Sequence, residues 1–293
     1  MPETVTNDLE TFDAYRPLLF AIAYRMVGSV MDAEDIVQDA YLRWQRRTEA
    51  DVQAPRAYLS AIVTRLSIDH LRAAHTQRET YTGTWLPEPL ITEREPDVAD
   101  VATLHESLSM AFLVLLESLT PDERAIFLLH DIFAYDFHEI AGIVGKSEAN
   151  CRQIARRARQ QIHERRPRFD PSPERRQQLT QQFITACTNG DLSGLLATLA
   201  HDVTLWADGG GKARAPFRPI RGADRVAAFI LGILRNVPED TEVRAVAVNG
   251  QPGYLFLFGG AINAVLAFHI VDGRIQALHA VANPDKLRAV DAR

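Results

Sequence analysis

An arginine-rich segment in the middle of the chain carries the side chains best suited to binding another molecule. Residues 151–168 contain seven arginines and one acid, Glu164, although the chain of 293 residues has a formal net charge of −6. Guanidinium groups stay charged at neutral pH, and they bind both phosphates and the edge of guanine. Because the positive charge is concentrated in one short segment of an acidic chain, we expect this segment to contact nucleic acid.

The pattern around this segment predicts a helix-turn-helix. Apolar spacing indicates one helix over residues 136–144, a turn at Gly145 and Lys146, and a second helix over 147–162 with Ser147 as its cap. The residues expected to form the shared core are Ile140, Ala141, Val144, Cys151, Ile154 and Ala158. Base edges would be read by Arg152, Gln153 and Arg156, and phosphates would be bound by Arg157, Arg159, Arg165 and Arg166. The alternative is a solvated basic helix whose arginines make ordinary ion pairs.

Composition narrows the class of protein. A hydrophobic fraction of 46% is enough for packed cores, and no apolar run approaches the length needed to cross a bilayer. The acidic start of the chain does not resemble a secretory signal. Two cysteines, Cys151 and Cys187, are too few for a disulfide framework or a zinc cluster. We therefore expect a cytoplasmic protein with no metal and no cofactor.

The spacing of apolar residues and the frequency of glycine and proline change along the chain, and these changes predict its domains and linkers. Helical periodicity extends to about residue 74, with a loop at 46–54, and resumes over 101–164; Gly83, Pro87, Pro89 and Pro96 mark a linker between them. Two further helices, at 174–188 and 192–199, precede strand-like runs at 203–206, 242–248, 254–258, 261–270 and 274–280. The expected fold is two all-α domains followed by an α+β domain. The expected boundaries are 8–80, a linker at 81–100, 101–166, a linker at 167–173, and 174–293.

Five motifs in this order resemble one family. Residues 32–42 (DAEDIVQDAYL) are similar to region 2 of the extracytoplasmic-function sigma factors, and residues from 119 (LTPDER) to 162 are similar to their region 4. Three further motifs, at 85–89 (WLPEP), 208–212 (DGGGK) and 283–287 (NPDKL), are similar to those of the SigJ-type members. The resemblance implies that the α+β domain is a SnoaL-like (NTF2-like) cone.

The resemblance also implies roles for individual residues in transcription initiation. Core RNA polymerase, through its β′ clamp helices and β flap, and promoter DNA are the implied partners, and no dedicated anti-sigma factor is expected. Residues matching the polymerase-binding surface are Asp35, Gln38 and Asp39. Residues matching the reader of the −10 element are Arg47, Arg56, Arg65 and Arg72. The −35 element would be read by Arg152, Gln153, Arg156, Arg157 and Arg159.

The C-terminal motifs imply regulation rather than catalysis. The residues expected at contacts between domains are Trp85, Pro87, Asp208, Gly209, Gly210, Gly211, Lys212, Asn283, Pro284, Asp285 and Lys286. The DGGGK loop does not have the spacing of a phosphate-binding loop, because Trp206 stands where the first glycine is required. An isomerase or cyclase that uses Trp206, Asp208, His269 or His279 is one alternative. A ligand-responsive helix-turn-helix regulator is another, and an unidentified small ligand in the C-terminal cavity is left open as a partner.

Overall fold

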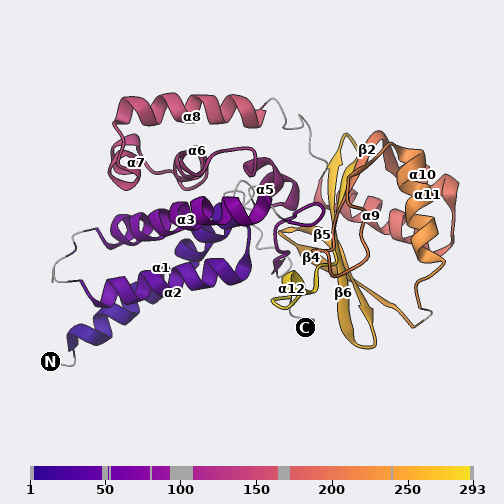
Figure 1. Cartoon of the computed structure of the whole chain (residues 1–293), viewed down its shortest axis with the longest axis horizontal. Coiled ribbons are helices and arrows are strands. Elements are labelled where there is room, and N and C mark those ends of the chain that lie inside the picture. The colour runs from indigo at the N-terminus through magenta and orange to yellow at the C-terminus, as the bar shows by residue number, and fades with distance from the viewer. Residues whose placement is uncertain are drawn as a thin grey trace. The chain divides into compact units, whose positions relative to one another are not determined.

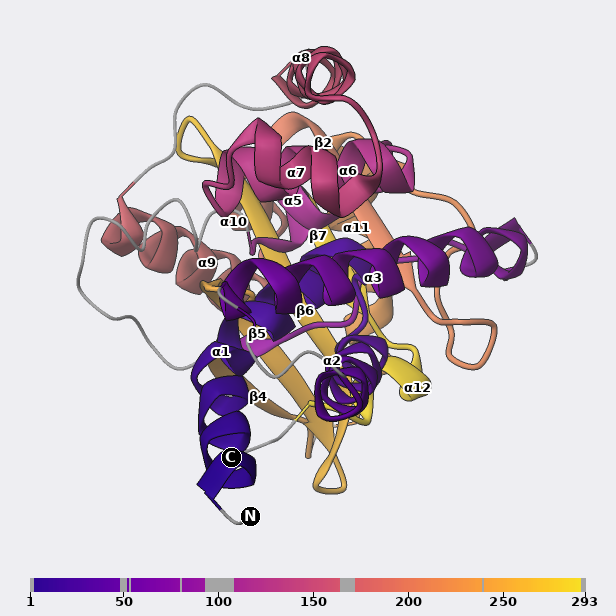
Figure 2. The ribbon, with the colours of Figure 1, turned by 90° about the vertical axis from the view of Figure 1, so that its left-hand side faces the viewer.

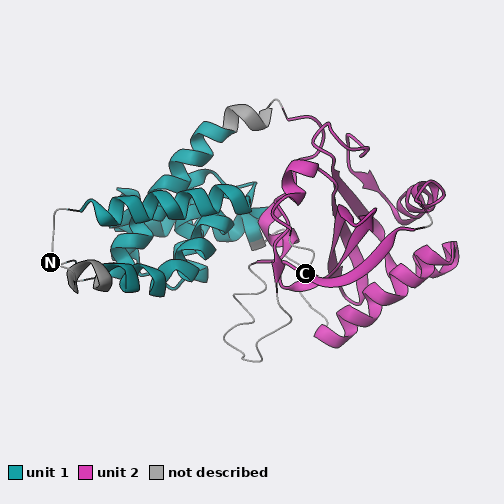
Figure 3. Cartoon of the chain, turned by 90° about the horizontal axis from the view of Figure 1, so that it is seen from below, with its two compact units in different colours: residues 1–79, 115–165 teal, residues 80–114, 166–293 magenta. Residues whose placement is uncertain are grey.

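The chain folds into two compact units. Unit 1 comprises residues 1–79 and 115–165, and unit 2 comprises residues 80–114 and 166–293 (Figure 3). The computed structural model describes residues 3–47, 52, 54–79, 81–92, 108–163, 172–238 and 240–290. Within those residues, every helix is too short or too polar to span a membrane. The predicted phosphate contacts Arg165 and Arg166, most of the 46–54 loop, the start of the helical run at 101 and most of the linker at 167–173 lie outside the described residues.

The regular elements in the described part of unit 1 are all helices (Figure 1). Its elements are α1 (Glu3–Val27), α2 (Val30–Gln45), α3 (Pro55–Glu79), the last residues of α5 (Met110–Leu116), α6 (Pro121–Phe127), a π-helical turn η1 (Leu128–Ile132), α7 (Phe137–Val144) and α8 (Glu148–His163). The long helix α3 packs against α1 and α2 on one side and against α6 and α7 on the other, as both views of the ribbon show (Figures 1 and 2). This central helix therefore joins the two sigma-like halves of unit 1.

Local capping fixes where these helices begin. Ser29 accepts the amide of Asp32 at 3.2 Å and caps α2. Capping boxes open the next two helices, because Thr120 pairs with Glu123 at α6 and Asp136 pairs with Glu139 at α7. Gly145 ends α7 with a φ of 67°, a left-handed conformation that glycine adopts without steric cost. The predicted helix-turn-helix is confirmed by these boundaries.

The predicted core of the helix-turn-helix is partly wrong. Ile140, Cys151 and Ala158 are buried as expected, whereas Ala141, Val144 and Ile154 are only half-buried. The fully packed positions that complete the core are Ile143, Ala155 and Ile162. A helix places neighbours 100° apart, so a shift of one residue moves the expected apolar stripe to an adjacent line.

Unit 2 combines a mixed sheet with helices. Its elements are β1 (Ile91–Thr92), α9 (Pro173–Thr188), α10 (Leu192–Thr198), β2 (Leu199–Asp208), β3 (Ile220–Arg221), α11 (Ala223–Leu234), β4 (Glu242–Val248), β5 (Gln251–Phe258), β6 (Ala261–Val271), β7 (Arg274–Val281) and α12 (Pro284–Leu287). The strand order is β1-β4-β5-β6-β7-β2-β3. One core cluster joins the sheet to α9, α10 and α11, and a second cluster joins it to α12 and to Leu86.

The sheet differs from the predicted antiparallel meander in one parallel pairing and in two short strands, β1 and β3, that the sequence does not predict. Strand β2 begins at Leu199, earlier than predicted, and runs parallel to β7, with Leu205 beside Leu278 and Asp208 beside Val281. The other pairings are antiparallel. The parallel pairing joins residues about seventy positions apart in the chain, so neighbouring turn signals could not predict it.

The segment that the sequence predicts as a free linker is partly built into unit 2. Strand β1 pairs with the edge of β4, with Ile91 opposite Val248. The amide of Leu90 also donates to the Asn249 side chain at 3.1 Å, and Leu86 is fully buried. Among the described residues 81–92, the last two therefore extend the sheet, and Leu86 packs into its core.

Candidate nucleic-acid interface and buried anchor cluster

Helix α8 presents its predicted DNA-binding side chains to solvent. Arg152, Gln153, Arg156, Arg157 and Arg159 are all exposed, on the face opposite the buried core of the helix-turn-helix. Ser147 accepts the amide of Asn150 at 3.3 Å and so fixes the start of the helix. The structure thus brings these five residues onto one basic helix face, which is suited to major-groove reading.

Two of these arginines have acidic partners that the arginine-rich segment itself does not contain. Arg152 pairs with Glu148 at 2.7 Å, and Arg159 pairs with Asp131 at 2.7 Å. The hydrogen bonds from His138 and Arg152 lower the pKa of Glu148. Arg156 and Arg157 make no ion pair with any residue that the structure describes. The central part of the helix face is therefore the most available to an anionic partner.

Helix α2 exposes the side chains expected to bind polymerase. Asp35, Gln38 and Asp39 are exposed, while Ile36, Val37, Ala40 and Trp44 are buried. The predicted separation of an acidic face from an apolar stripe is therefore present in the structure.

The arginines expected to read the −10 element instead contact the helix-turn-helix half of unit 1. Arg56 donates to the carbonyl of Phe133 at 3.1 Å and lies 4.7 Å from the centre of the Tyr135 ring. Arg65 donates to the carbonyls of Ile143 at 2.8 Å and Gly142 at 2.7 Å. Both guanidinium groups are thus held by backbone oxygens near α7.

Further polar pairs join α3 to α6 and to the residues that precede α7. Arg72 binds Asp122 at 2.9 Å, and Asp122 also binds Lys146 at 2.8 Å. The Ser60 and Tyr135 hydroxyls, both buried, lie 2.7 Å apart. We refer to this set of α3 interactions, made by Arg56, Ser60, Arg65 and Arg72, as the closure contact. Arg47 lies outside it, because it pairs with Asp8 and stacks 3.5 Å from the Trp44 ring.

In unit 2 the motifs at 85–89, 208–212 and 283–287 meet around one buried carboxylate. Asp208 has no exposed surface, and each of its oxygens accepts two hydrogen bonds. One oxygen accepts from the Tyr81 hydroxyl at 2.6 Å and the Gly210 amide at 3.0 Å. The other accepts from the Leu86 amide at 2.9 Å and the Lys286 ammonium at 2.7 Å. All acceptor positions of this buried charge are used.

Lys286 joins the motif around Trp85 to the end of the chain. Its ammonium also donates to the carbonyl of Leu86, and it lies 4.2 Å from the centre of the Trp85 ring and 5.1 Å from that of Tyr81. Asn283 caps α12 and donates to the Tyr81 hydroxyl at 2.8 Å. We call Asp208, Lys286, Tyr81 and Asn283 the anchor cluster. Burial, reinforced by the hydrogen bond to Asp208, raises the pKa of Tyr81 above its usual range.

Glycines are required in the loop after Asp208 because other chain segments approach closely. A Cβ atom on Gly210 would lie 2.3 Å from the Asn283 amide nitrogen, and Gly210 has a φ of 58°. A Cβ on Gly209 would lie 2.4 Å from the carbonyl oxygen of Ala213, and one on Gly211 would meet Thr82 at 3.2 Å. Lys212 pairs with Asp285, and Pro87 is buried. Pro284 occupies the first turn of α12.

The other candidate catalytic side chains do not form an acid–base pair with Asp208. His279 is buried opposite Trp206 on the neighbouring strand, and its Nδ1 makes no hydrogen bond within the described residues. Burial, with a smaller effect of His269, lowers the pKa of His279 to about 3. This imidazole is therefore neutral at physiological pH.

Three residues that hold these contacts received no role in the sequence analysis: Tyr81, Asp122 and Tyr135. The Tyr81 hydroxyl accepts from the predicted Asn283 across about two hundred positions, while Tyr135 and Asp122 hold α3 from the helix-turn-helix side. A tyrosine just before a glycine–tryptophan–proline segment is the one local signal that could have drawn attention to Tyr81. Nothing in the sequence around Tyr135 marks its buried hydroxyl.

Comparisons with known proteins agree with this architecture. Residues 11–76 match the Sigma-70 region 2 family, and residues 109–162 match the Sigma-70 region 4 family. The chain is 40% identical to the ECF RNA polymerase sigma factor SigJ of Mycobacterium tuberculosis, over 95% of this chain and 93% of that protein. It is 36% identical to the probable ECF sigma factor SigI of the same organism, over 94% of each.

A solved structure extends the similarity to the fold. The crystal structure of Mycobacterium tuberculosis SigJ matches with a TM-score of 0.75 and 37% identity, covering 95% of this chain and 98% of that one. The expected fold class, two helical sigma domains followed by a SnoaL-like α+β domain, is confirmed. The chain therefore belongs to the extracytoplasmic-function RNA polymerase sigma factors.

Proposed function

We propose that this sigma factor directs core RNA polymerase to promoters through three helices with separate roles. Asp35, Gln38 and Asp39 on α2 bind the β′ clamp helices, while region 4 meets the β flap. Helix α8 reads the −35 element and α3, with Arg47, reads the −10 element. Family membership and the exposed faces of α2 and α8 support these assignments. The cytoplasm is the expected location, and the absence of a dedicated anti-sigma factor stays a prediction.

We also propose that the closure contact makes this conformation unable to bind a whole promoter. The observation that carries the proposal is that Arg65, a −10 reader, is bonded to backbone carbonyls of region 4. The centres of the −10 and −35 promoter elements are ~25 base pairs apart, which corresponds to about 85 Å at 3.4 Å per base pair. Helices α3 and α7 are in hydrogen-bond contact, so the two readers reach both elements only after the closure contact opens.

The C-terminal unit is proposed to regulate this opening rather than to catalyse a reaction. The anchor cluster holds residues 81–92, which precede region 4 in the chain. Holding this segment limits how far regions 2 and 4 can separate. An isomerase would need a carboxylate free to accept a proton, whereas Asp208 already accepts four hydrogen bonds. This saturation argues against the enzyme alternative, and two sigma regions argue against a simple repressor.

In vitro transcription with core polymerase tests whether the conformation held by the closure contact, called the closed form, limits promoter binding. Asp122→Asn weakens the closure contact from the region 4 side without altering a proposed reader on α3 or α8. Loss of about 0.7 kcal/mol from this partly exposed pair corresponds to roughly a threefold gain in open form and in run-off product at limiting sigma factor. Asp224→Asn, which changes an acid in the first turn of α11, is the matched control and should leave output unchanged. Equal or lower output from Asp122→Asn contradicts the closed form.

A further inference from the structure

A pocket beside the anchor cluster has walls from two separate segments of unit 2. Its volume is about 580 Å³, within the range typical of small-molecule sites. One wall is the turn at Thr82 and Gly83, and the opposite walls are the loop after Asp208 and helix α11. Apolar surface comes from Phe217, Phe229 and Ile233. Phe217 is 73% exposed, so its ring is accessible from solvent.

The charges that line this pocket all have one sign. Lys212 and Arg214 line it, and none of the described residues that line it is acidic. Lys212 already pairs with Asp285. Arg214 is exposed and makes no ion pair or hydrogen bond with any described residue. The pocket thus offers a free guanidinium next to aromatic and aliphatic walls.

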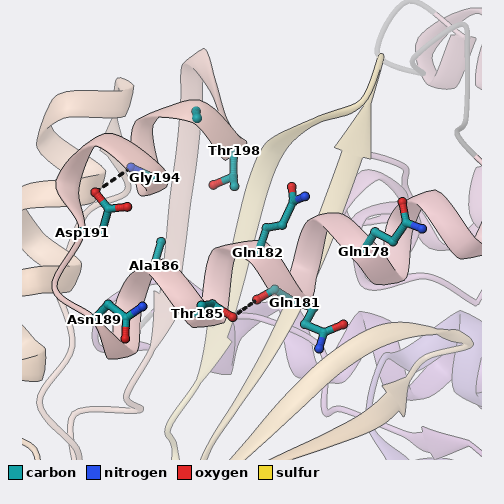
Figure 4. A pocket seen from close by; sticks show the side chains of 10 residues that line it. Gln178, Gln181, Gln182, Thr185, Ala186, Asn189, Asp191, Gly194 and Thr198 are labelled. Carbon is teal, nitrogen blue, oxygen red and sulfur yellow. Dashed lines mark hydrogen bonds between the residues drawn. The ribbon is translucent and has the colours of Figure 1, made fainter.

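A second pocket of unit 2 provides a contrast. It has a volume of about 520 Å³ and lies along α9 and α10. Its lining is mostly amide and hydroxyl side chains, such as Gln178, Gln182 and Thr198, together with Asp191 (Figure 4). Asp191 is engaged in capping α10, where it accepts the Gly194 amide at 3.0 Å (Figure 4). The described residues of its lining include no cation and no aromatic ring, so this second pocket differs in chemistry from the first.

We infer that the pocket lined by Arg214 binds an apolar carboxylate. The guanidinium of Arg214 matches a carboxylate in a bidentate geometry, and such charged hydrogen bonds are stronger than neutral ones. The hydrocarbon part packs against Phe217, Phe229 and Ile233. A bound molecule touches Thr82 and Gly83 at the same time as the loop after Asp208. It therefore ties the segment that precedes region 4 more tightly to the C-terminal unit.

Direct binding to the full-length protein tests this site without relying on promoter activity. The probes are 2-naphthoate and its neutral isostere 2-naphthamide, titrated by equilibrium dialysis. We expect saturable 1:1 binding of 2-naphthoate, with the amide about tenfold weaker because it lacks the charge. Arg214→Gln should weaken naphthoate about tenfold and leave the amide unchanged. Arg218→Gln, an exposed arginine of the same loop that does not line the pocket, should change neither.

Hydrogen exchange measures independently whether the bound carboxylate holds the segment at Thr82 and Gly83 more tightly. Amides at residues 82–86 should exchange more slowly with 2-naphthoate bound to the natural protein, but not in Arg214→Gln. The inference is overturned if naphthoate shows no saturable binding, if naphthamide binds as tightly, or if Arg214→Gln and Arg218→Gln weaken binding equally. Both substitutions are on exposed side chains, and unchanged melting curves establish that the variants fold.

Discussion

The closure contact and the anchor cluster both depend on cationic side chains, but in opposite settings. In the closure contact, exposed arginines of α3 bind backbone carbonyls and the partly exposed Asp122. In the anchor cluster, the Asp208 side chain has no exposure and that of Lys286 has 9%. Water can replace the bonds of these exposed arginines at little cost, whereas breaking the second set leaves a buried charge without its partner. The comparison teaches that one contact is suited to opening in function and the other to staying closed.

The largest expected effect comes from removing the cation of the anchor cluster. Lys286→Met keeps the length of the side chain but leaves Asp208 buried without its counter-charge. We expect a loss of about 3–5 kcal/mol in the free energy of unfolding of unit 2, measured by urea titration with tryptophan fluorescence. Lys212→Met breaks the exposed pair with Asp285 and should cost far less. Similar losses for the two variants would remove the distinction between a buried anchor and an exposed contact.

A smaller effect is expected from filling the space beside Asn283. Gly210→Ala adds a Cβ where the Asn283 amide nitrogen lies, so we expect about 2–3 kcal/mol of destabilisation in the same titration. Gly190→Ala is the control, since Gly190 has a comparable φ of 64° and no atom within 4 Å of the added Cβ. It should show only the conformational cost, about 1 kcal/mol. A loss at Gly190 as large as that at Gly210 would mean that close packing is not the reason for this glycine.

Low pH should reduce the free energy of unfolding of unit 2, because His279 is buried in its neutral form. Its folded pKa, about 3, is below the unfolded value of 6.5, so the unfolded chain binds more protons between these pH values. Stability is therefore full above pH 6.5 and falls as the pH drops toward 3, by about 1 kcal/mol per pH unit from this residue. His279→Leu should flatten that slope in urea titrations between pH 6.5 and 4.5. An unchanged slope would show that other groups dominate the acid response.

The smallest effect is expected at the closure contact. Tyr135→Phe removes the hydroxyl that binds Ser60, and we expect about 1 kcal/mol of loss in the stability of that contact. Hydrogen exchange at residues 137–144 should rise about fivefold, while the global unfolding of unit 2 stays unchanged. Tyr58→Phe is the control, because the Tyr58 hydroxyl has no hydrogen bond with a described residue. Protection that is unaltered in Tyr135→Phe would argue that the contact does not depend on this bond.

Local features of the fold could be predicted from sequence, because their causes lie within a few residues. Capping by Thr120, the left-handed turn at Gly145 and the start of α3 at Pro55 each depend on neighbouring side chains. The exposed face of α2 follows from helical periodicity in the same way. Region 4 was predicted well for this reason, apart from the shift by one residue in its core.

The remaining contacts could not be predicted, because their partners are distant or leave no pattern in the sequence. Arg65 binds carbonyl oxygens, which every residue has, so no side chain at positions 142 and 143 signals the pairing. Asp208 collects donors from positions 81, 86 and 286. Family motifs indicated which loops matter, whereas the physical reason, a shared buried carboxylate, required the fold.

Strand β1 has a consequence for how this domain can be separated from its sigma factor. It pairs with Ala247 and Val248 at the outer edge of β4, and without it the backbone groups of this end of β4 would lose their partners. A fragment that begins at residue 174 would expose this part of the edge and would also leave Asp208 without the Tyr81 and Leu86 donors. Such a fragment is therefore more prone to strand-to-strand self-association than one that begins at residue 81 and keeps β1.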